Sequence, residues 1–122
     1  MAQRATKTIA VIDDDEAARQ SLAFLLGAED YRVETFESAV AFLEQRSTRF
    51  TCIIVDQHMP EMTGLELVQQ LRAGVRRIPV MLLSGALTEA DLVRAGQLEV
   101  ETVLEKPTDQ CKVLAFVASA MS

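Results

Sequence analysis

Cysteine, histidine and tryptophan are scarce in this chain of 122 residues, which contains two cysteines, one histidine and no tryptophan. Cys52 and Cys111 are far apart and form no CxxC pair, so neither a cysteine–histidine zinc site nor a disulfide framework is predicted. No apolar run is long enough to span a bilayer, and Met1–Thr8 lacks the apolar core of a signal peptide. We therefore expect a protein of the reducing cytoplasm without a membrane segment.

Basic residues are also fewer than acidic ones. The 12 lysines and arginines against 18 aspartates and glutamates give a formal net charge of −6. This balance argues against a surface that attracts nucleic acid or anionic lipid. The hydrophobic fraction of 49% and the charged fraction of 25% are typical of a globular chain. The length fits one domain with a real core, so we predict a single domain over residues 1–122.

Five short segments have the pattern of β-strands. Three are nearly continuous apolar runs, as in strands buried on both faces, one alternates like a strand with a wetter face, and the last is a short strand. The segments are Thr8–Ile12, the alternating Tyr31–Phe36, Cys52–Val55, Pro79–Leu83 and Val100–Leu104.

A helical pattern follows each predicted strand. Ser38 and Thr108 are the residues expected to cap the second and last helices, and Thr88 with Asp91 resembles a capping box for the fourth. We expect the first helix to close at Gly27 and the third at Gly74.

The alternation of five strands with five helices predicts an α/β fold, with a five-stranded parallel sheet and helices on both faces. We assume the strand order 2-1-3-4-5 of flavodoxin-like folds. Ligands of such sheets bind beyond the carboxyl ends of the strands, where the strand order reverses. In the assumed order, that point lies between the first and third strands.

Residues able to do chemistry follow the predicted strands. Asp13 and Asp14 follow the first strand, Asp56 the third, Ser84 the fourth and Lys106 the fifth. Carboxylates at roughly 4 Å repel one another by about 4 kcal/mol per pair at an effective dielectric of about 20. Uptake of a proton or a bound divalent cation relieves this repulsion. An oxygen-only ligand set with open water positions favours Mg²⁺ over Ca²⁺.

These groups together are the parts of a phosphoryl-transfer site. Such a site needs a carboxylate nucleophile, a metal that neutralises charge, and donors such as Ser84 and Lys106. The common phosphate cradles GxxxxGK(S/T) and GxGxxG are missing. The alternative for the acids from Asp13 to Glu16 is that they only cap the helix that follows.

The motifs occur in a specific order along the chain: Asp13-Asp14 after an apolar run, Asp56 at the start of DQHMPEMTG, Ser84-Gly85-Ala86, and Lys106-Pro107. With this ordered set, the chain resembles a response-regulator receiver domain of two-component signal transduction over essentially its full length. The resemblance implies a phosphorylation-dependent switch. Such a domain catalyses only its own phosphorylation and slow dephosphorylation, and is not an enzyme with a diffusible product.

The resemblance also implies how the acceptor works. Asp56 would take a phosphoryl group from a phosphohistidine on a sensor histidine kinase or a histidine phosphotransfer protein. Asp14, Asp56 and the backbone carbonyl of His58 would bind Mg²⁺ directly, and Asp13 would act through water. Lys106 would pair with a phosphoryl oxygen.

Further roles surround the acceptor in this resemblance. Ser84 would turn inward to hydrogen-bond the phosphoryl group, and this movement would signal phosphorylation to an output domain or partner. Gly85 and Ala86 would leave the approach to Asp56 open. The Lys106–Pro107 peptide bond would be cis.

Three positions depart from the usual pattern of that family. Val103 stands where an aromatic that rotates between exposed and buried positions is common, so we expect a different readout. Thr108 replaces a common aromatic after Lys-Pro. Gln57, which we expect to line the pocket with Gly85 and Ala86, replaces the usual apolar residue after the acceptor.

Two other functions fit parts of the pattern. A Mg²⁺-dependent phosphohydrolase also uses an aspartyl nucleophile, but it usually has a second acid where this chain has His58. A scaffold that keeps the fold without being phosphorylated is disfavoured by the intact acid, hydroxyl and lysine set.

We expect the His58 side chain to border the pocket, and hypothesise that it tunes the lifetime of the acyl phosphate. The face of the fourth helix, fifth strand and last helix is a candidate surface for a homodimer.

Overall fold

A computed structural model describes residues 7–45, 49–74 and 77–122 of the chain. Within these residues, five strands form one parallel sheet in the order β2-β1-β3-β4-β5. The strands are β1 (Thr8–Ile12), β2 (Arg32–Phe36), β3 (Phe50–Asp56), β4 (Val80–Ser84) and β5 (Thr102–Glu105). The predicted fold class and strand order are therefore confirmed.

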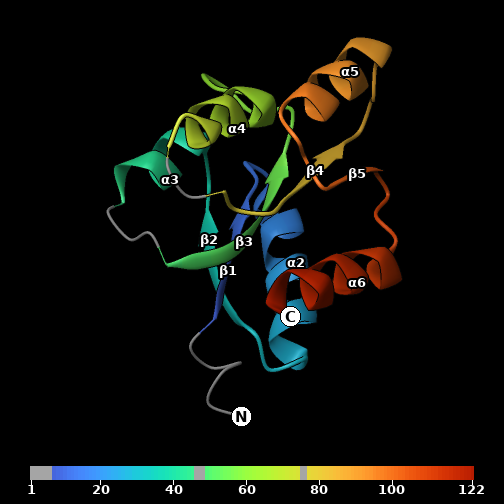
Figure 1. Cartoon of the computed structure of the whole chain (residues 1–122). Helices are drawn as coiled ribbons and strands as arrows, with labels where there is room; N and C mark the ends of the chain where they lie inside the picture. The colour runs from blue at the N-terminus through green and yellow to red at the C-terminus, as the bar shows by residue number, and fades with distance from the viewer. Residues whose placement is uncertain (1–6, 46–48, 75–76) are drawn as a thin grey trace.

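Helices cover both faces of the sheet (Figure 1). The described helices are α2 (Glu16–Ala28), α3 (Ala39–Glu44), α4 (Gly64–Arg72), α5 (Glu89–Gln97) and α6 (Gln110–Met121). Helices α2 and α6 lie on one face, and α3, α4 and α5 lie on the other. In the described part of the chain, no helix has the length and apolar character needed to cross a membrane.

Two apolar clusters fill the space between sheet and helices, because successive strand residues point to opposite faces. In β3, Cys52 and Ile54 pack with the α2 and α6 side, while Ile53 and Val55 pack with the α3, α4 and α5 side. All four are buried. The central strands are therefore buried on both faces, as their continuous apolar runs predict. Cys52 is a core residue with no exposed surface, and this burial raises the pKa of its thiol to about 12.

A short polar side chain fixes the start of each helix by accepting a hydrogen bond from a backbone N–H of the first turn. These caps are Asp15, Ser38, Thr63, Thr88 and Asp109. Ser38 was predicted correctly, and Thr88 accepts the N–H of Asp91 as expected. The reciprocal capping box is found at Thr63 and Glu66 at the start of α4.

Several predicted boundaries were wrong by one or two residues. The cap of α6 is Asp109 and not Thr108, because the Asp109 carboxylate accepts the N–H of Cys111 at 2.8 Å. Helix α2 runs past Gly27, and the left-handed residue that follows it is Asp30, with φ 68°. Helix α4 ends before Gly74, since its C-cap is Ala73 in ordinary helical geometry.

Strand boundaries shifted in the same way. β2 and β5 begin one and two residues later than predicted, at Arg32 and Thr102, and β3 begins earlier, at Phe50. The alternating Tyr31–Phe36 segment forms an edge strand with exposed and half-buried positions, in agreement with its wetter face.

Candidate phosphoryl-acceptor site

Three carboxylates meet where β1 and β3 end side by side. Ile12 pairs with Val55 in the sheet, so the next residues of both strands emerge at the same edge. Carboxylate oxygens of Asp13, Asp14 and Asp56 all lie within 4.8 Å of one another. Asp13 and Asp56 are 2% and 4% exposed, whereas Asp14 faces solvent. The convergence predicted from the assumed strand order is present.

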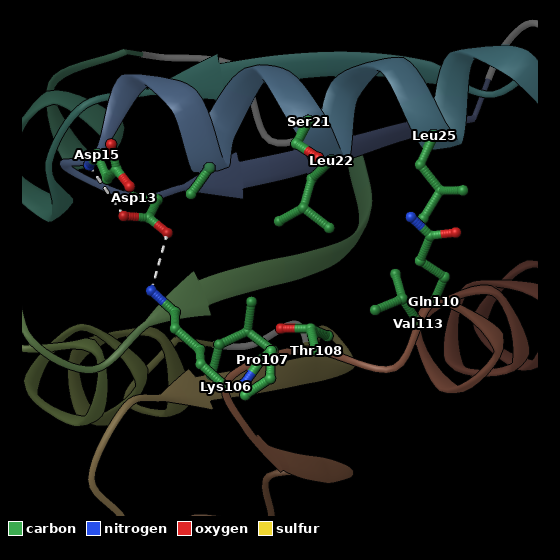
Figure 2. A pocket seen from close by; sticks show the side chains of 12 residues that line it. Asp13, Asp15, Ser21, Leu22, Leu25, Lys106, Pro107, Thr108, Gln110 and Val113 are labelled. Atoms are coloured by element: carbon green, nitrogen blue, oxygen red, sulfur yellow. Dashed lines mark hydrogen bonds and ion pairs between the residues drawn. The ribbon is translucent and has the colours of Figure 1, made fainter.

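Backbone contacts hold Asp13 in place. Its N–H donates to the carbonyl of Phe36 at 3.1 Å, and its carbonyl accepts a hydrogen bond from the Arg19 guanidinium at 2.8 Å. One carboxylate oxygen, Oδ1, accepts the N–H of Asp15 at 3.0 Å, and the other, Oδ2, faces Lys106 (Figure 2). Asp13 is therefore a fixed charge between the strand and the first turn of α2.

Lys106 reaches the carboxylates from the end of β5. Its Nζ lies 3.0 Å from Oδ1 of Asp56 and 3.4 Å from Oδ2 of Asp13. Its N–H donates to the carbonyl of Ser84 at 2.8 Å, and the Lys106–Pro107 peptide bond is cis, as predicted. Partial burial alone lowers the pKa of the ammonium group, but the two carboxylates outweigh it and raise the pKa above its ordinary value. Lys106 thus stays protonated.

The surroundings of Asp56 disfavour the charged form of its carboxylate. Burial raises its pKa above 3.8, Lys106 opposes this rise, and the neighbouring charges of Asp13 and Asp14 add to it. Its Oδ1 has the ion pair with Lys106 but receives no properly aligned hydrogen bond from the described residues. A buried carboxylate oxygen with so little compensation is suited to an additional positive partner.

The donor set at this point fits a hard divalent cation. Three carboxylates are present, one of them open to solvent, and neither cysteine nor imidazole contributes to the cluster of described residues. Oxygen ligands together with accessible water positions are what Mg²⁺ prefers.

The residues that follow Asp56 anchor the strand end. Gln57 donates its N–H to Leu83 at 2.8 Å, and its buried side chain accepts the N–H of Leu65 at 2.8 Å. The Gln57 side chain therefore fixes the start of α4. Gly64 packs directly against the end of β3, because a Cβ there would lie 2.7 Å from the Asp56 carbonyl oxygen. We did not anticipate these two roles, although Gly64 ends the motif that begins at Asp56.

Ser84 ends β4 and is completely buried. Its Oγ accepts the N–H of Ala86 and lies 3.2 Å from Nε2 of His58. The side chain of His58 itself is exposed. Gly85 and Ala86 are exposed, and a Cβ added to Gly85 would meet no atom within 4 Å. Small residues thus leave open space beside the end of β4.

Val103 occupies the middle of the neighbouring edge strand. It pairs with Leu82 and is half-buried against the cluster beneath α3, α4 and α5. A short branched side chain at this place cannot make the large rotation of an aromatic ring.

A cavity of about 260 Å³ borders Asp13 on the α2 and α6 side of the sheet. Asp13 and Lys106 line one end of it, and Leu22 and Leu25 of α2 face Val113 of α6 at the other (Figure 2). The cavity therefore connects the charged site to an apolar wall.

Comparison with known proteins agrees with this geometry. The family model of the response regulator receiver domain matches residues 9–118. The transcriptional regulatory protein FixJ of Bradyrhizobium diazoefficiens is 35% identical over 93% of this chain and 56% of its own length. FixJ of Azorhizobium caulinodans is 38% identical over 91% of this chain and 53% of its own length. The chain thus spans about half the length of these curated relatives.

Solved structures give the same result. FixJ-N superimposes with a TM-score of 0.81 at 28% identity, covering 94% of this chain and 93% of that one. A response regulator receiver protein from Pseudomonas putida superimposes with a TM-score of 0.87 at 26% identity, covering 94% and 98%. With the fold, the acidic site and the match over nearly all its length, this chain belongs to the response-regulator receiver domain family.

Proposed function

We propose that this domain is a phosphorylation-dependent switch whose acceptor is Asp56. The observation that carries the proposal is the buried Asp56 carboxylate, which lies beside Lys106 and two further acids and has one oxygen that receives no hydrogen bond from the described residues. Receiver domains act as signalling switches, and their acidic pockets bind Mg²⁺.

The transfer step is a displacement at phosphorus. An Asp56 carboxylate oxygen attacks the phosphorus of a phosphohistidine, a P–O bond forms, the P–N bond breaks, and the imidazole leaves with the electron pair. The Lys106 ammonium, 3.0 Å from the attacking carboxylate, would pair with a phosphoryl oxygen as the group arrives. Asp13, Asp14, Asp56 and the His58 carbonyl would hold Mg²⁺, Asp13 through water, and the ion would neutralise the charge of the transferred group.

The partners follow from this chemistry. The phosphoryl donor would be a sensor histidine kinase or a histidine phosphotransfer protein in the cytoplasm. Once Asp56 is phosphorylated, Ser84 would turn toward the phosphoryl group and shift an existing equilibrium between two conformations. A homodimer through α5, β5 and α6 is one way to transmit that shift, because Leu92 and Val93 on α5 are 49% and 57% exposed.

Acetyl phosphate tests the proposal without the cognate kinase. Incubation with this donor and Mg²⁺ should increase the mass of the intact protein by about 80 Da, the mass of HPO₃. Chelation of the metal, or Asp56→Asn, should abolish the increase, whereas Asp109→Asn at the start of α6 should retain it. No increase in the wild type, or an equal increase in Asp56→Asn, would exclude Asp56 as the acceptor.

A further inference from the structure

The His58–Ser84 hydrogen bond joins the loop after β3 to the end of β4, next to the acceptor. His58 lies two residues after Asp56, and its Nε2 is 3.2 Å from Oγ of Ser84. The same Oγ accepts the N–H of Ala86 at 3.2 Å. Since Ser84 is fully buried, these two partners satisfy a hydroxyl that has no access to water.

The bond engages Ser84 on the side of the sheet away from Asp56. In β4, Ser84 continues the row of Val80 and Leu82, which pack beneath α3, α4 and α5. In β3, Asp56 continues the row of Cys52 and Ile54, which pack with α2 and α6. Side chains in one row of a strand point to one face. The Ser84 hydroxyl must therefore change partners before it can serve a phosphoryl group on Asp56.

Val103 in β5 is half-buried and has no ring that could rotate, whereas His58 contacts the Ser84 hydroxyl directly. We propose that His58 is a positioning residue that holds Ser84 in its unphosphorylated arrangement, and that phosphorylation must break the His58–Ser84 bond. This inference rests on the proposed function, because it names what the phosphoryl group competes with.

The expected effect follows from the strength of one hydrogen bond. A net contribution of a typical bond corresponds to roughly a 3- to 10-fold change in an equilibrium constant. If the bond stabilises only the unphosphorylated arrangement, its loss increases the affinity for a phosphoryl mimic by that factor. Beryllofluoride, which binds carboxylates as a tetrahedral phosphoryl analogue, is a suitable probe.

Three variants separate the bond from the packing of the ring. His58→Phe keeps a flat ring but has no nitrogen to bond Ser84. His58→Gln keeps a polar nitrogen at a similar distance from the backbone and should rescue the wild-type behaviour. Ser84→Ala removes the hydroxyl on which His58 acts.

The first measurement needs no phosphoryl group. The ¹⁵N resonance of the His58 Nε2, recorded without Mg²⁺, should shift in Ser84→Ala because the imidazole loses its partner. An unchanged resonance would overturn the inference even if Asp56 proves to be the acceptor.

The second measurement is the dissociation constant of beryllofluoride in the presence of Mg²⁺. We expect His58→Phe to bind about 3- to 10-fold more tightly than the wild type, and His58→Gln to match the wild type. In a Ser84→Ala background, His58→Phe should have no further effect. Equal binding by wild type and His58→Phe, or tightening that persists without Ser84, would overturn the inference alone. Absence of binding by the wild type would overturn the proposed function and the inference with it.

Discussion

At the residue scale, Asp56 combines burial with like charge nearby. A carboxyl whose pKa is raised by folding contributes stability when it is protonated. That contribution is complete below the unfolded pKa and is lost as the pH rises through the folded pKa. The pKa of Asp56 is raised mainly by burial. At neutral pH without metal, the ionised Asp56 therefore makes the folded protein less stable than a neutral side chain would.

The destabilising effect of the ionised carboxylate gives a prediction for Asp56→Asn, which keeps the shape of the side chain and removes its charge. In urea titrations at pH 7 without divalent ions, the variant should have a larger free energy of unfolding than the wild type. Added Mg²⁺ should stabilise only the wild type, by about 1.4 kcal/mol at ten times the dissociation constant. A less stable variant in metal-free buffer would show that the Lys106 ion pair outweighs burial and repulsion.

The sequence predicts the charged residues of the site well and their uncharged neighbours less well. Asp13, Asp56 and Lys106 follow strands of one parallel sheet, whose carboxyl ends share an edge, so periodicity and strand order bring them together. The side chains of Gln57 and His58 depend on the path of one loop and on rotamers. Their contacts with Leu65 and Ser84 therefore cannot be predicted from the sequence and are known only from the structure.

At the element scale, the start of α4 and the end of β3 fit together closely. A Cβ at Gly64 would lie 2.7 Å from the Asp56 carbonyl oxygen and 2.8 Å from Cδ1 of Leu82. Both neighbours belong to central strands of the sheet, so neither can move freely. The close approach of α4 to β3 therefore requires a residue without a side chain at this helix start.

Gly64→Ala should accordingly reduce the free energy of unfolding by about 1–3 kcal/mol through overpacking. It should also slow phosphorylation by acetyl phosphate, because the strand end that carries Asp56 has to shift. Gly96→Ala is the matched control in α5, where a Cβ meets no atom within 4 Å. The control should gain about 0.4–1 kcal/mol. If both variants are equally stable in urea titrations, the close approach of Gly64 has no energetic consequence.

One guanidinium group, at the C-terminal end of α4, bonds three backbone carbonyls of other segments. Arg72, whose side chain is 10% exposed, donates to the carbonyls of Leu98, Ile78 and Glu99 at 2.8, 2.7 and 3.1 Å. It also lies 3.6 Å from the Glu101 carboxylate. These contacts link α4 with the segments before β4 and β5.

Arg72→Met keeps much of the apolar stem and leaves these carbonyls without their donor. We expect the free energy of unfolding to fall by about 2–4 kcal/mol, which is the scale of losing more than one charge-assisted hydrogen bond. Arg94→Met in α5 is the control, since the Arg94 guanidinium bonds the exposed Gln97 and its loss should matter by less than about 0.5 kcal/mol. Similar urea midpoints for the two variants would contradict a structural role for Arg72.

Boundaries of elements were predicted less accurately than their existence. The apolar pattern of the sequence predicts where a helix forms. The ends of the helix depend on which nearby side-chain oxygen accepts a hydrogen bond from a free backbone N–H. Thr108 and Asp109 are both good caps by residue type, and the coordinates select Asp109. Gly74 was a reasonable terminator by type, but Ala73 already closes α4 without a left-handed residue.

At the scale of the whole molecule, one edge of the sheet gathers residues from distant parts of the chain. The ends of β1, β3, β4 and β5 contribute Asp13, Asp56, Ser84 and Lys106. The proposed phosphorylation of Asp56 would therefore change the charge at the junction of four strands. Because both faces of this sheet are packed, we expect the response to pass through the segments at its carboxyl edge, where His58 and Ser84 meet.

Chemical trapping of the acyl phosphate tests the central claim most directly. Borohydride reduces an aspartyl phosphate to homoserine and leaves free carboxylates unchanged. After incubation with acetyl phosphate and Mg²⁺, peptide sequencing by mass spectrometry should find homoserine at position 56 only, and none when the metal is chelated. Homoserine at position 13 or 14, or an unmodified chain, would contradict the account of Asp56 as the phosphoryl acceptor.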